Sequence, residues 1–262
     1  MDEAGAALKL IGRAYADLGI RAVRHRLSLP GEGAGEGDGG GKYVADPELW
    51  RRATALLREV LDASGIPYEA VEGEAAFYGP KIDVQIADPA GREATLSTVQ
   101  IDFHQPERFD LRYIGPDGAR HRPVMVHRSV IGSVERAVAH LVEEHGGAFP
   151  AWLAPVQLLI LPVAQAQYAA AEKLLHRARR TGLRAEIAGP EHGTLGARIR
   201  AARLVPYQAV SGEREAEGDG DLVAVRLRDG RRPGVVPGGE LVDRIAARVA
   251  ARGLALWDGD AA

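Results

Sequence analysis

The sequence predicts an α/β (α+β) protein with two domains, residues 1–150 and residues 151–262. Three observations lead to this prediction. Apolar residues at helical spacing mark the beginning of the chain, a run of consecutive strands with turn signals follows, and strands then alternate with helices. Consecutive strands indicate a largely antiparallel sheet with helices, whereas the alternation indicates a compact mixed-sheet domain.

Two helices are expected before the strands. Helical spacing predicts an amphipathic helix over residues 4–18, whose apolar face has no evident target in the sequence. An extended segment follows, and then the glycine-rich residues 31–41, which we expect to form a flexible loop. Asp46 and Pro47 provide a cap and a proline at the first helical position, so a second helix should run from there to Ser64.

Strand signals dominate residues 68–127. Strands separated by Gly, Pro and Asp turn signals are expected at residues 81–87, 94–103, 110–114 and 122–127. This spacing predicts an antiparallel meander, which a helix over residues 130–145 then closes.

The second domain begins after a boundary at residues 150–155. Its expected strands are residues 156–161, 184–187, 207–211 and 222–227, and its expected helices are residues 166–181, 193–203 and 240–252.

Composition narrows the functional class. The net charge of -3 does not indicate a nucleic-acid binder, and the absence of cysteine excludes disulfides, a thiol nucleophile and a cysteine-ligated metal. No apolar run approaches the ~20 residues that span a bilayer, and the first residues do not resemble a signal peptide. We therefore expect a soluble cytoplasmic protein that binds neither membranes nor DNA.

Residues 132–136 (GSVER) have the features of an anion-binding helix start. Gly132 and Ser133 are small enough to let a ligand approach the backbone, and Arg136 would project from the first helical turn. A helix N-terminus favours anions, and a guanidinium group matches phosphate oxygens in a bidentate manner. The alternative from the residues alone is an ion pair between Arg136 and a nearby carboxylate.

Four segments, in order and with matching intervals, resemble the C-terminal half of threonyl-tRNA synthetase. They are AFYGPKIDVQI, TVQIDFHQPERFDLRYIGPDG, HRPVMVHRSVIGSVER and GAFPAWLAPVQ. The resemblance implies part of a class II synthetase antiparallel sheet, followed by an anticodon-binding-type mixed-sheet domain. It also implies descent from an ATP-dependent threonine–tRNA ligase of protein biosynthesis.

The resemblance implies roles for individual residues. Arg136 would be the catalytic residue that holds the γ-phosphate of ATP while the amino-acid carboxylate attacks the α-phosphate. The residues that would bind ATP are Thr98, Ser133 and Arg136, and those that would face the amino-acid pocket are Tyr78, Lys81 and Gln100. From the sequence alone, Tyr78 is equally a core residue and Gln100 a strand residue that satisfies backbone groups.

His127 matches one of three zinc ligands of the family, in which the metal selects threonine. The other two ligands lie in a part of the family chain that precedes residue 1 here, and one histidine does not hold zinc. We therefore expect that this chain alone binds no zinc. The alternative for His127 is an ordinary strand-end histidine.

Glu215 and Arg226 match family residues that contact anticodon bases, so tRNA is the nucleic-acid partner that the resemblance implies. The alternative for Glu215 and Arg226 is a solvated surface pair. Family motifs 1 and 2 have no counterpart in the sequence, and Thr95-Leu96-Ser97 stands where the family has Gln-Cys-Gly.

The sequence therefore predicts a chain that is inactive alone or is one piece of a split synthetase. Its partner would be a complementing synthetase half or a second copy. The alternative is a non-catalytic paralogue that acts as an RNA- or protein-interaction module.

Overall fold

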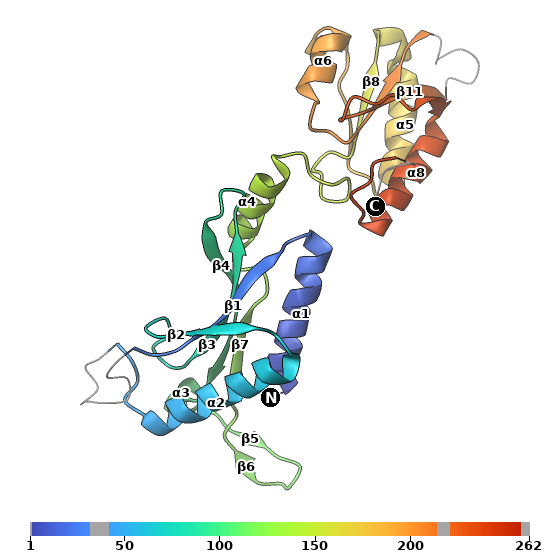
Figure 1. Cartoon of the computed structure of the whole chain (residues 1–262). Helices are drawn as coiled ribbons and strands as arrows, with labels where there is room; N and C mark the ends of the chain where they lie inside the picture. Colours follow the sequence, from blue (N-terminus) through green and yellow to red (C-terminus); the bar gives the residue numbers. More distant parts are fainter. Residues whose placement is uncertain (1, 32–41, 214–220, 258–262) are drawn as a thin grey trace. The chain divides into compact units, whose positions relative to one another are not determined.

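The computed structural model describes residues 2–31, 42–213 and 221–257 and divides the chain into two compact units, unit 1 (Met1–Glu144) and unit 2 (His145–Ala262) (Figure 1). Apart from Gly31, the expected flexible loop at residues 31–41 lies outside the described residues. Within these described ranges, no helix has both the length and the apolar character needed to cross a membrane.

Unit 1 contains a five-stranded sheet in the order β2-β1-β3-β4-β7 and a separate β5-β6 pair. Its strands are β1 (Ala22–Ser28), β2 (Tyr68–Val71), β3 (Lys81–Ala87), β4 (Glu93–Asp102), β5 (Tyr113–Ile114), β6 (Arg120–His121) and β7 (Met125–Ser129). Its helices are α1 (Asp2–Leu18), α2 (Pro47–Ser64), α3 (His104–Arg108) and α4 (Val134–His145). Strands β3 and β4 are antiparallel neighbours, as the predicted meander requires. Strand β4 then pairs directly with β7, because the strand expected at residues 110–114 is reduced to β5, which pairs with β6 outside this sheet. The parallel pairing of β1 with β2 was not predicted.

Helix α2 begins and ends where the sequence predicts. The Asp46 side chain accepts a hydrogen bond from the Leu49 backbone N–H at 3.0 Å, which satisfies a donor that the first helical turn leaves unpaired. Gly65 ends the helix in the left-handed conformation, which glycine adopts without steric cost. Local capping chemistry therefore fixes both ends of this helix.

Helix α1 has a target that the sequence does not reveal. Its buried residues Ala7, Leu8 and Ile11 lie on the side that packs against β4 and β7. The Tyr15 hydroxyl lies 2.7 Å from the Ser97 hydroxyl, 82 residues further along the chain. The apolar face of α1 thus forms part of the unit 1 core.

Unit 2 contains a second five-stranded sheet in the order β12-β11-β10-β8-β9. Its strands are β8 (Leu158–Pro162), β9 (Ala185–Ile187), β10 (Tyr207–Ser211), β11 (Leu222–Leu227) and β12 (Gly234–Pro237). Its helices are α5 (Tyr168–Arg180), α6 (Leu195–Ala201) and α8 (Gly238–Ala251), with 3₁₀ turns at Gln165–Gln167 and Pro190–His192. Parallel and antiparallel pairs occur together, as the mixed-sheet prediction requires, and β12 is the strand that the sequence analysis missed.

The unit 2 sheet is covered on both faces. Leu158 and Ile160 of β8 belong to the core shared with α5 and α8, and Leu159 and Leu161 belong to a second cluster with α6. Helices α6 and α8 therefore lie on opposite sides of the sheet (Figure 1).

Candidate active site

The unit 1 sheet has one apolar face and one polar face. Strand pairing places Lys81 opposite Gln100, Asp83 opposite Thr98, and His127 opposite Gln100. Directly paired residues point to the same side of a sheet, so these side chains share one face. The intervening residues, which face the other side with the helices, include Ile82, Val84, Val99 and Ile101. The structure therefore brings four of the predicted site residues together on the polar face.

Tyr78 joins this face from the turn before β3. Its hydroxyl donates a hydrogen bond to Oε1 of Gln100, and its ring centroid lies 5.4 Å from that of His127. Gln100 in turn donates from Nε2 to the Thr98 hydroxyl at 3.4 Å. Burial, together with the negative charge of Asp102, raises the pKa of Tyr78 and keeps its hydroxyl protonated. A hydrogen-bonded row thus links residues predicted to bind the amino acid to one predicted to bind ATP.

Two glycines let loops approach β4 closely. A Cβ on Gly79 would lie 2.8 Å from the Ile101 carbonyl oxygen, so a side chain there would displace the turn that carries Tyr78. A Cβ on Gly132 would lie 2.7 Å from the Leu96 carbonyl oxygen, and the φ of Gly132 is +66°. Both close approaches require glycine, which explains why these loops lie against β4.

Lys81 is held by a buried carboxylate that the sequence analysis missed. Oδ2 of Asp83 lies 2.7 Å from Nζ of Lys81, accepts from the Ser28 hydroxyl at 2.7 Å and lies 3.3 Å from a guanidinium nitrogen of Arg26. The Asp83 side chain is 1% exposed. Among the described residues, Asp83 Oδ1 and Arg26 Nε are buried without a hydrogen-bond partner. The signal in the sequence was an acidic residue two positions after Lys81, inside an otherwise apolar strand.

His127 is paired with a second buried carboxylate. Its Nε2 lies 2.9 Å from Oδ2 of Asp102, whose side chain is fully buried. The described part of the chain holds no group of three or more ligating side chains that could bind a metal ion. Structural zinc sites take four protein ligands and catalytic zinc sites take three. These residues by themselves therefore do not fit zinc.

Ser133 and Arg136 form the start of α4. The Ser133 hydroxyl accepts from the Arg136 backbone N–H at 3.3 Å, and the Ser133 carbonyl accepts from Ala137 at 3.1 Å. The Arg136 side chain is exposed and makes no salt bridge with any described residue. The ion pair considered as an alternative from the sequence therefore does not form within the described residues.

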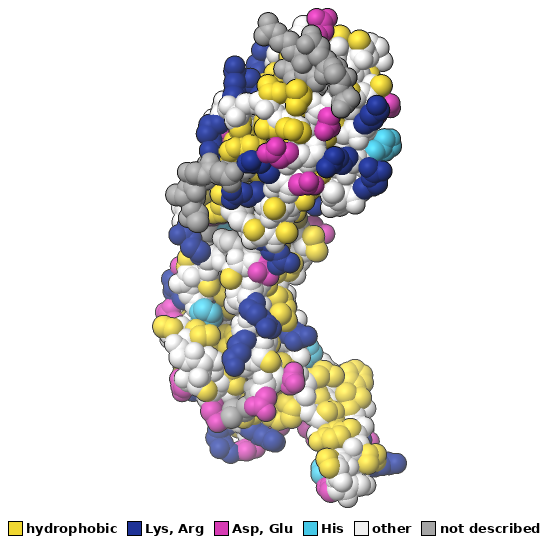
Figure 2. Space-filling model, turned by 90° about the vertical axis from the view of Figure 1, so that its right-hand side faces the viewer, with side chains coloured by type: hydrophobic (Ala, Val, Ile, Leu, Met, Phe, Trp, Pro, Cys, Tyr) yellow, Lys and Arg dark blue, Asp and Glu magenta, His cyan; other side chains and the backbone are white. Residues whose placement is uncertain are grey.

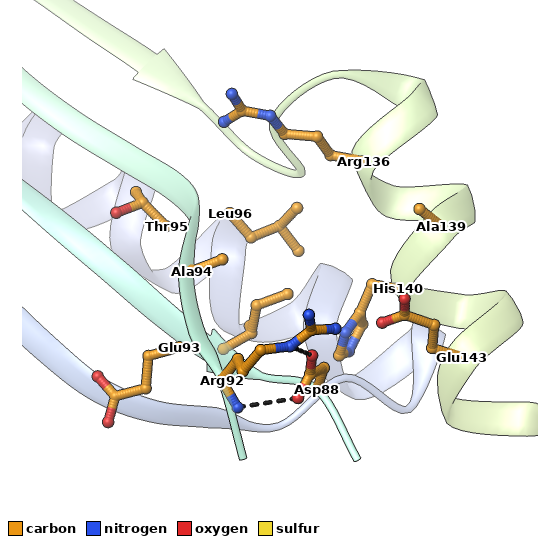
Figure 3. A pocket seen from close by; sticks show the side chains of 11 residues that line it. Asp88, Arg92, Glu93, Ala94, Thr95, Leu96, Arg136, Ala139, His140 and Glu143 are labelled. Atoms are coloured by element: carbon orange, nitrogen blue, oxygen red, sulfur yellow. Dashed lines mark hydrogen bonds and ion pairs between the residues drawn. The ribbon is translucent and has the colours of Figure 1, made fainter. Parts of the chain in front are cut away.

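A pocket of about 590 Å³ lies between α4 and the connected ends of β3 and β4 (Figure 3). Its apolar lining residues are Ile86, Ala94, Leu96 and Ala139. Arg136 lies at one end of the pocket and the Asp88–Arg92 ion pair, with a 2.6 Å contact, at the other (Figure 3). Thr98 does not line this pocket, so the predicted ATP residues fall into two places, Thr98 on the polar face and Arg136 beside the pocket.

The predicted tRNA residues lie in unit 2. Arg226 is half-buried on β11 and is paired with Gln208 of β10. Gln208 donates from Nε2 to the carbonyl of Ala202, directly after α6, so Arg226 points to the α6 side of the sheet. Glu215 lies outside the described residues.

Comparison with known families identifies both units. Residues 1–145 match the model of the class II tRNA synthetase core domain (G, H, P, S and T), and residues 157–248 match that of the anticodon-binding domain. The chain therefore belongs to the class II aminoacyl-tRNA synthetase family. Within that class it is threonyl-tRNA synthetase-like and corresponds to the C-terminal half.

Individual relatives support this placement. The chain is 46% identical over 219 residues to threonine–tRNA ligase 1 of Bacillus subtilis, a match that covers 82% of this chain and 33% of the relative. A threonine–tRNA ligase of Listeria monocytogenes is also 46% identical over 219 residues, again 82% of this chain and 33% of the relative. The chain thus spans about a third of the length of the curated relatives it matches.

Solved structures show the same fold. The RNA binding domain of threonyl-tRNA synthetase from Cryptosporidium parvum Iowa II has a TM-score of 0.80 at 28% identity, covering 99% of this chain and 62% of that one. A putative threonyl-tRNA synthetase from Aeropyrum pernix has a TM-score of 0.65 at 22% identity, covering 94% of this chain and 62% of that one.

Proposed function

We propose that this chain supplies the amino-acid face and one phosphate-binding arginine of a threonine–tRNA ligase site, and that unit 2 binds tRNA. Tyr78, Lys81 and Gln100 would hold the amino acid. Thr98, Ser133 and Arg136 would hold ATP, with Arg136 on the γ-phosphate. Motifs 1 and 2, which have no counterpart in these residues, would come from another polypeptide segment.

The observation that carries this proposal is the single polar face of the unit 1 sheet. Strand register and one turn gather Tyr78, Lys81, Thr98 and Gln100 there, while the other face is buried under helices. Preorganised polar groups on a rigid sheet are what binding and orienting a small zwitterionic substrate requires.

A complementing polypeptide or a second copy fits the surface of unit 1. Around the β5-β6 pair, Phe109, Tyr113, Ile114 and Val124 are exposed, and apolar side chains gather on this part of unit 1 (Figure 2). Contiguous exposed apolar surface is typical of sites that contact another protein. This surface supports a site completed by association.

Threonine-dependent ATP–pyrophosphate exchange tests the proposal. The chain would be assayed alone and mixed with the N-terminal two thirds of the Bacillus subtilis relative. We expect no exchange above background from the chain alone, because the family's motif 2, which carries the arginine that holds the α-phosphate, has no counterpart in it. We expect measurable exchange in the mixture.

Matched variants assign the activity to this chain. Arg136→Ala should abolish exchange in the mixture and Lys81→Met should lower it at least tenfold, about 1.4 kcal/mol or more. Arg128→Ala removes an exposed arginine that points away from the polar face and should leave exchange unchanged. Exchange by the chain alone would contradict the proposal. A mixture without exchange but with tRNA binding would favour the non-catalytic RNA-binding module.

A further inference from the structure

Three arginines recur along one side of α8. Arg244, Arg248 and the C-cap residue Arg252 are four residues apart, so they lie roughly one above another along the helix. Phosphates of an extended RNA strand repeat at a similar spacing of several ångströms along the backbone. An arginine row of this kind can contact successive phosphates.

Aromatic side chains hold two of these arginines in place. The Arg244 guanidinium lies 5.2 Å from the centre of the Trp257 ring, and that of Arg252 lies 5.8 Å from the Trp152 ring. Both distances fall within the range of cation–π attraction, which orders long side chains that would otherwise sample many rotamers. Both tryptophan side chains are also partly exposed, and an indole open to solvent is a surface on which a nucleobase can stack.

A pocket of about 250 Å³ lies beside this row. Its lining residues are Tyr207, Arg244, Ile245, Ala247, Arg248, Leu256 and Trp257. Among the described residues that line it, the charged ones are both cationic and the others are aromatic or apolar. A nucleotide unit has the matching chemistry, an anionic phosphate joined to a flat base.

Helix electrostatics account for only part of this arrangement. Basic residues near a helix C-terminus complement the helix dipole, and Arg244 also pairs with Glu240 at 2.9 Å. Dipole compensation requires neither a tryptophan beneath the guanidinium nor a pocket with two arginines in its wall.

The arginine row lies on the side of unit 2 away from Arg226. Val223, Val225 and Leu227 of β11 face the core shared with α5 and α8, and the alternating Arg226 faces the α6 side. An RNA that contacts Arg226 and the α8 row therefore contacts two separate surfaces.

We propose that Arg244, Arg248 and Arg252, with Trp257 and Trp152, form a second RNA-contacting surface, the α8 arginine face. It takes the phosphate backbone and an unstacked base of an RNA strand. An RNA strand suits it better than an acidic protein, because carboxylates would use the arginines but not the stacking faces. The inference rests on the proposed tRNA binding by unit 2 and assigns it a second surface.

Salt-dependent RNA binding by the full chain tests the inference. Fluorescence anisotropy would follow a labelled tRNA transcript at several salt concentrations. Arg244→Ala/Arg248→Ala should weaken binding about tenfold and lower the slope of log affinity against log salt by about 1.5, since each phosphate contact contributes about 0.7–1. Lys173→Ala/Arg180→Ala removes the same charge from exposed positions of α5 and should change the affinity less than twofold.

Four results would overturn the inference. Absence of tRNA binding by the wild-type chain would reject both the inference and the proposed tRNA binding by unit 2. Binding that is weakened by Arg226→Ala but equal in the α8 and α5 double variants would leave tRNA binding intact and reject only the α8 face. An α8 variant with weaker binding but a melting temperature lowered by more than about 5 °C relative to the α5 variant would assign the arginines a structural role. Polyglutamate that competes as well as unlabelled tRNA would assign the face to an acidic protein.

Discussion

The two units bury their strands in different ways. Every residue of β8 in unit 2 is buried and apolar, and helices cover both faces of its sheet. In unit 1, β3 is buried as completely at its centre, but Asp83 and Gln85 occupy the polar face. Burying a charge costs free energy unless it is paired, and such pairs are often no more stabilising than apolar residues of similar size. The polar face of unit 1 therefore indicates a site, whereas the unit 2 sheet is a scaffold whose binding groups lie outside its core.

The two units also differ in net charge. Acidic residues outnumber basic ones in residues 1–144, and basic residues outnumber acidic ones in residues 145–262. The net charge of -3 for the whole chain hides this difference. Total charge argued against nucleic-acid binding, but charge counted by unit shows that unit 2 carries an excess of basic residues, which is the sign that the proposed RNA binding requires.

The largest expected effect comes from matched core deletions, one in each unit. Ile160→Ala in unit 2 and Ile82→Ala in unit 1 each remove a fully buried side chain, so each should lower the free energy of unfolding of its own unit by about 3 kcal/mol. Scanning calorimetry of the full chain would resolve the two transitions. A variant that lowers both transitions equally would show that the units unfold together and would break the comparison.

On the polar face, the stability of unit 1 should depend more on the charge of a side chain than on its volume. Asp83→Ala leaves Lys81 and Arg26 without their shared carboxylate and should destabilise unit 1 by about 2–3 kcal/mol. Asp83→Asn keeps the shape and the acceptor for Ser28, so it should cost about half as much. Glu59→Ala, at an exposed position of α2, is the control. An Asp83→Ala variant as stable as this control would mean that the buried charge contributes nothing to folding.

The sequence predicted correctly those helices and strands whose ends are set by residues close in the chain, such as caps and turns. Residues 81–87, 207–211 and 222–227 coincide with β3, β10 and β11, and the Asp46-Pro47 start matches α2. Strand β12 and the parallel β1–β2 pair were missed, because short strands carry little periodicity and their pairing depends on tertiary contacts.

The candidate site was predictable only in part. Resemblance supplied Tyr78, Lys81 and Gln100; strand register places Lys81 beside Gln100, and the turn before β3 brings Tyr78 to them. Asp83 and Asp102 were missed because their importance depends on neighbours across the sheet, which sequence spacing does not reveal. Likewise, the target of α1 lies on β4 and β7, far along the chain.

A smaller effect should follow from removing the α2 cap. Asp46→Ala leaves the Leu49 N–H without its acceptor and should destabilise unit 1 by about 1 kcal/mol, with no change in unit 2. Asp62→Ala removes an acidic residue from the exposed side of the same helix without removing a cap and should differ from wild type by less than about 0.5 kcal/mol. Equal melting temperatures for the two variants would show that the cap does not limit the stability of unit 1.

The smallest effect concerns His25 of β1, and it should appear only in acid. Burial lowers the pKa of His25 in the folded state, so the folded chain binds its proton less readily than the unfolded chain. The stability associated with neutral His25 is therefore complete above the ordinary histidine pKa of about 6.5 and is lost as the pH falls through the lower folded value. Relative to wild type, His25→Gln should gain stability between pH 7 and about pH 5, by less than Asp46→Ala loses. Denaturant titration of unit 1 at several pH values would measure this gain, with His176→Gln on the exposed side of α5 as the control. Parallel pH profiles for wild type and His25→Gln would mean that the histidine is as well solvated in the folded chain as in the unfolded one. The position of His25 opposite Val84 in the sheet would then leave its side chain hydrated.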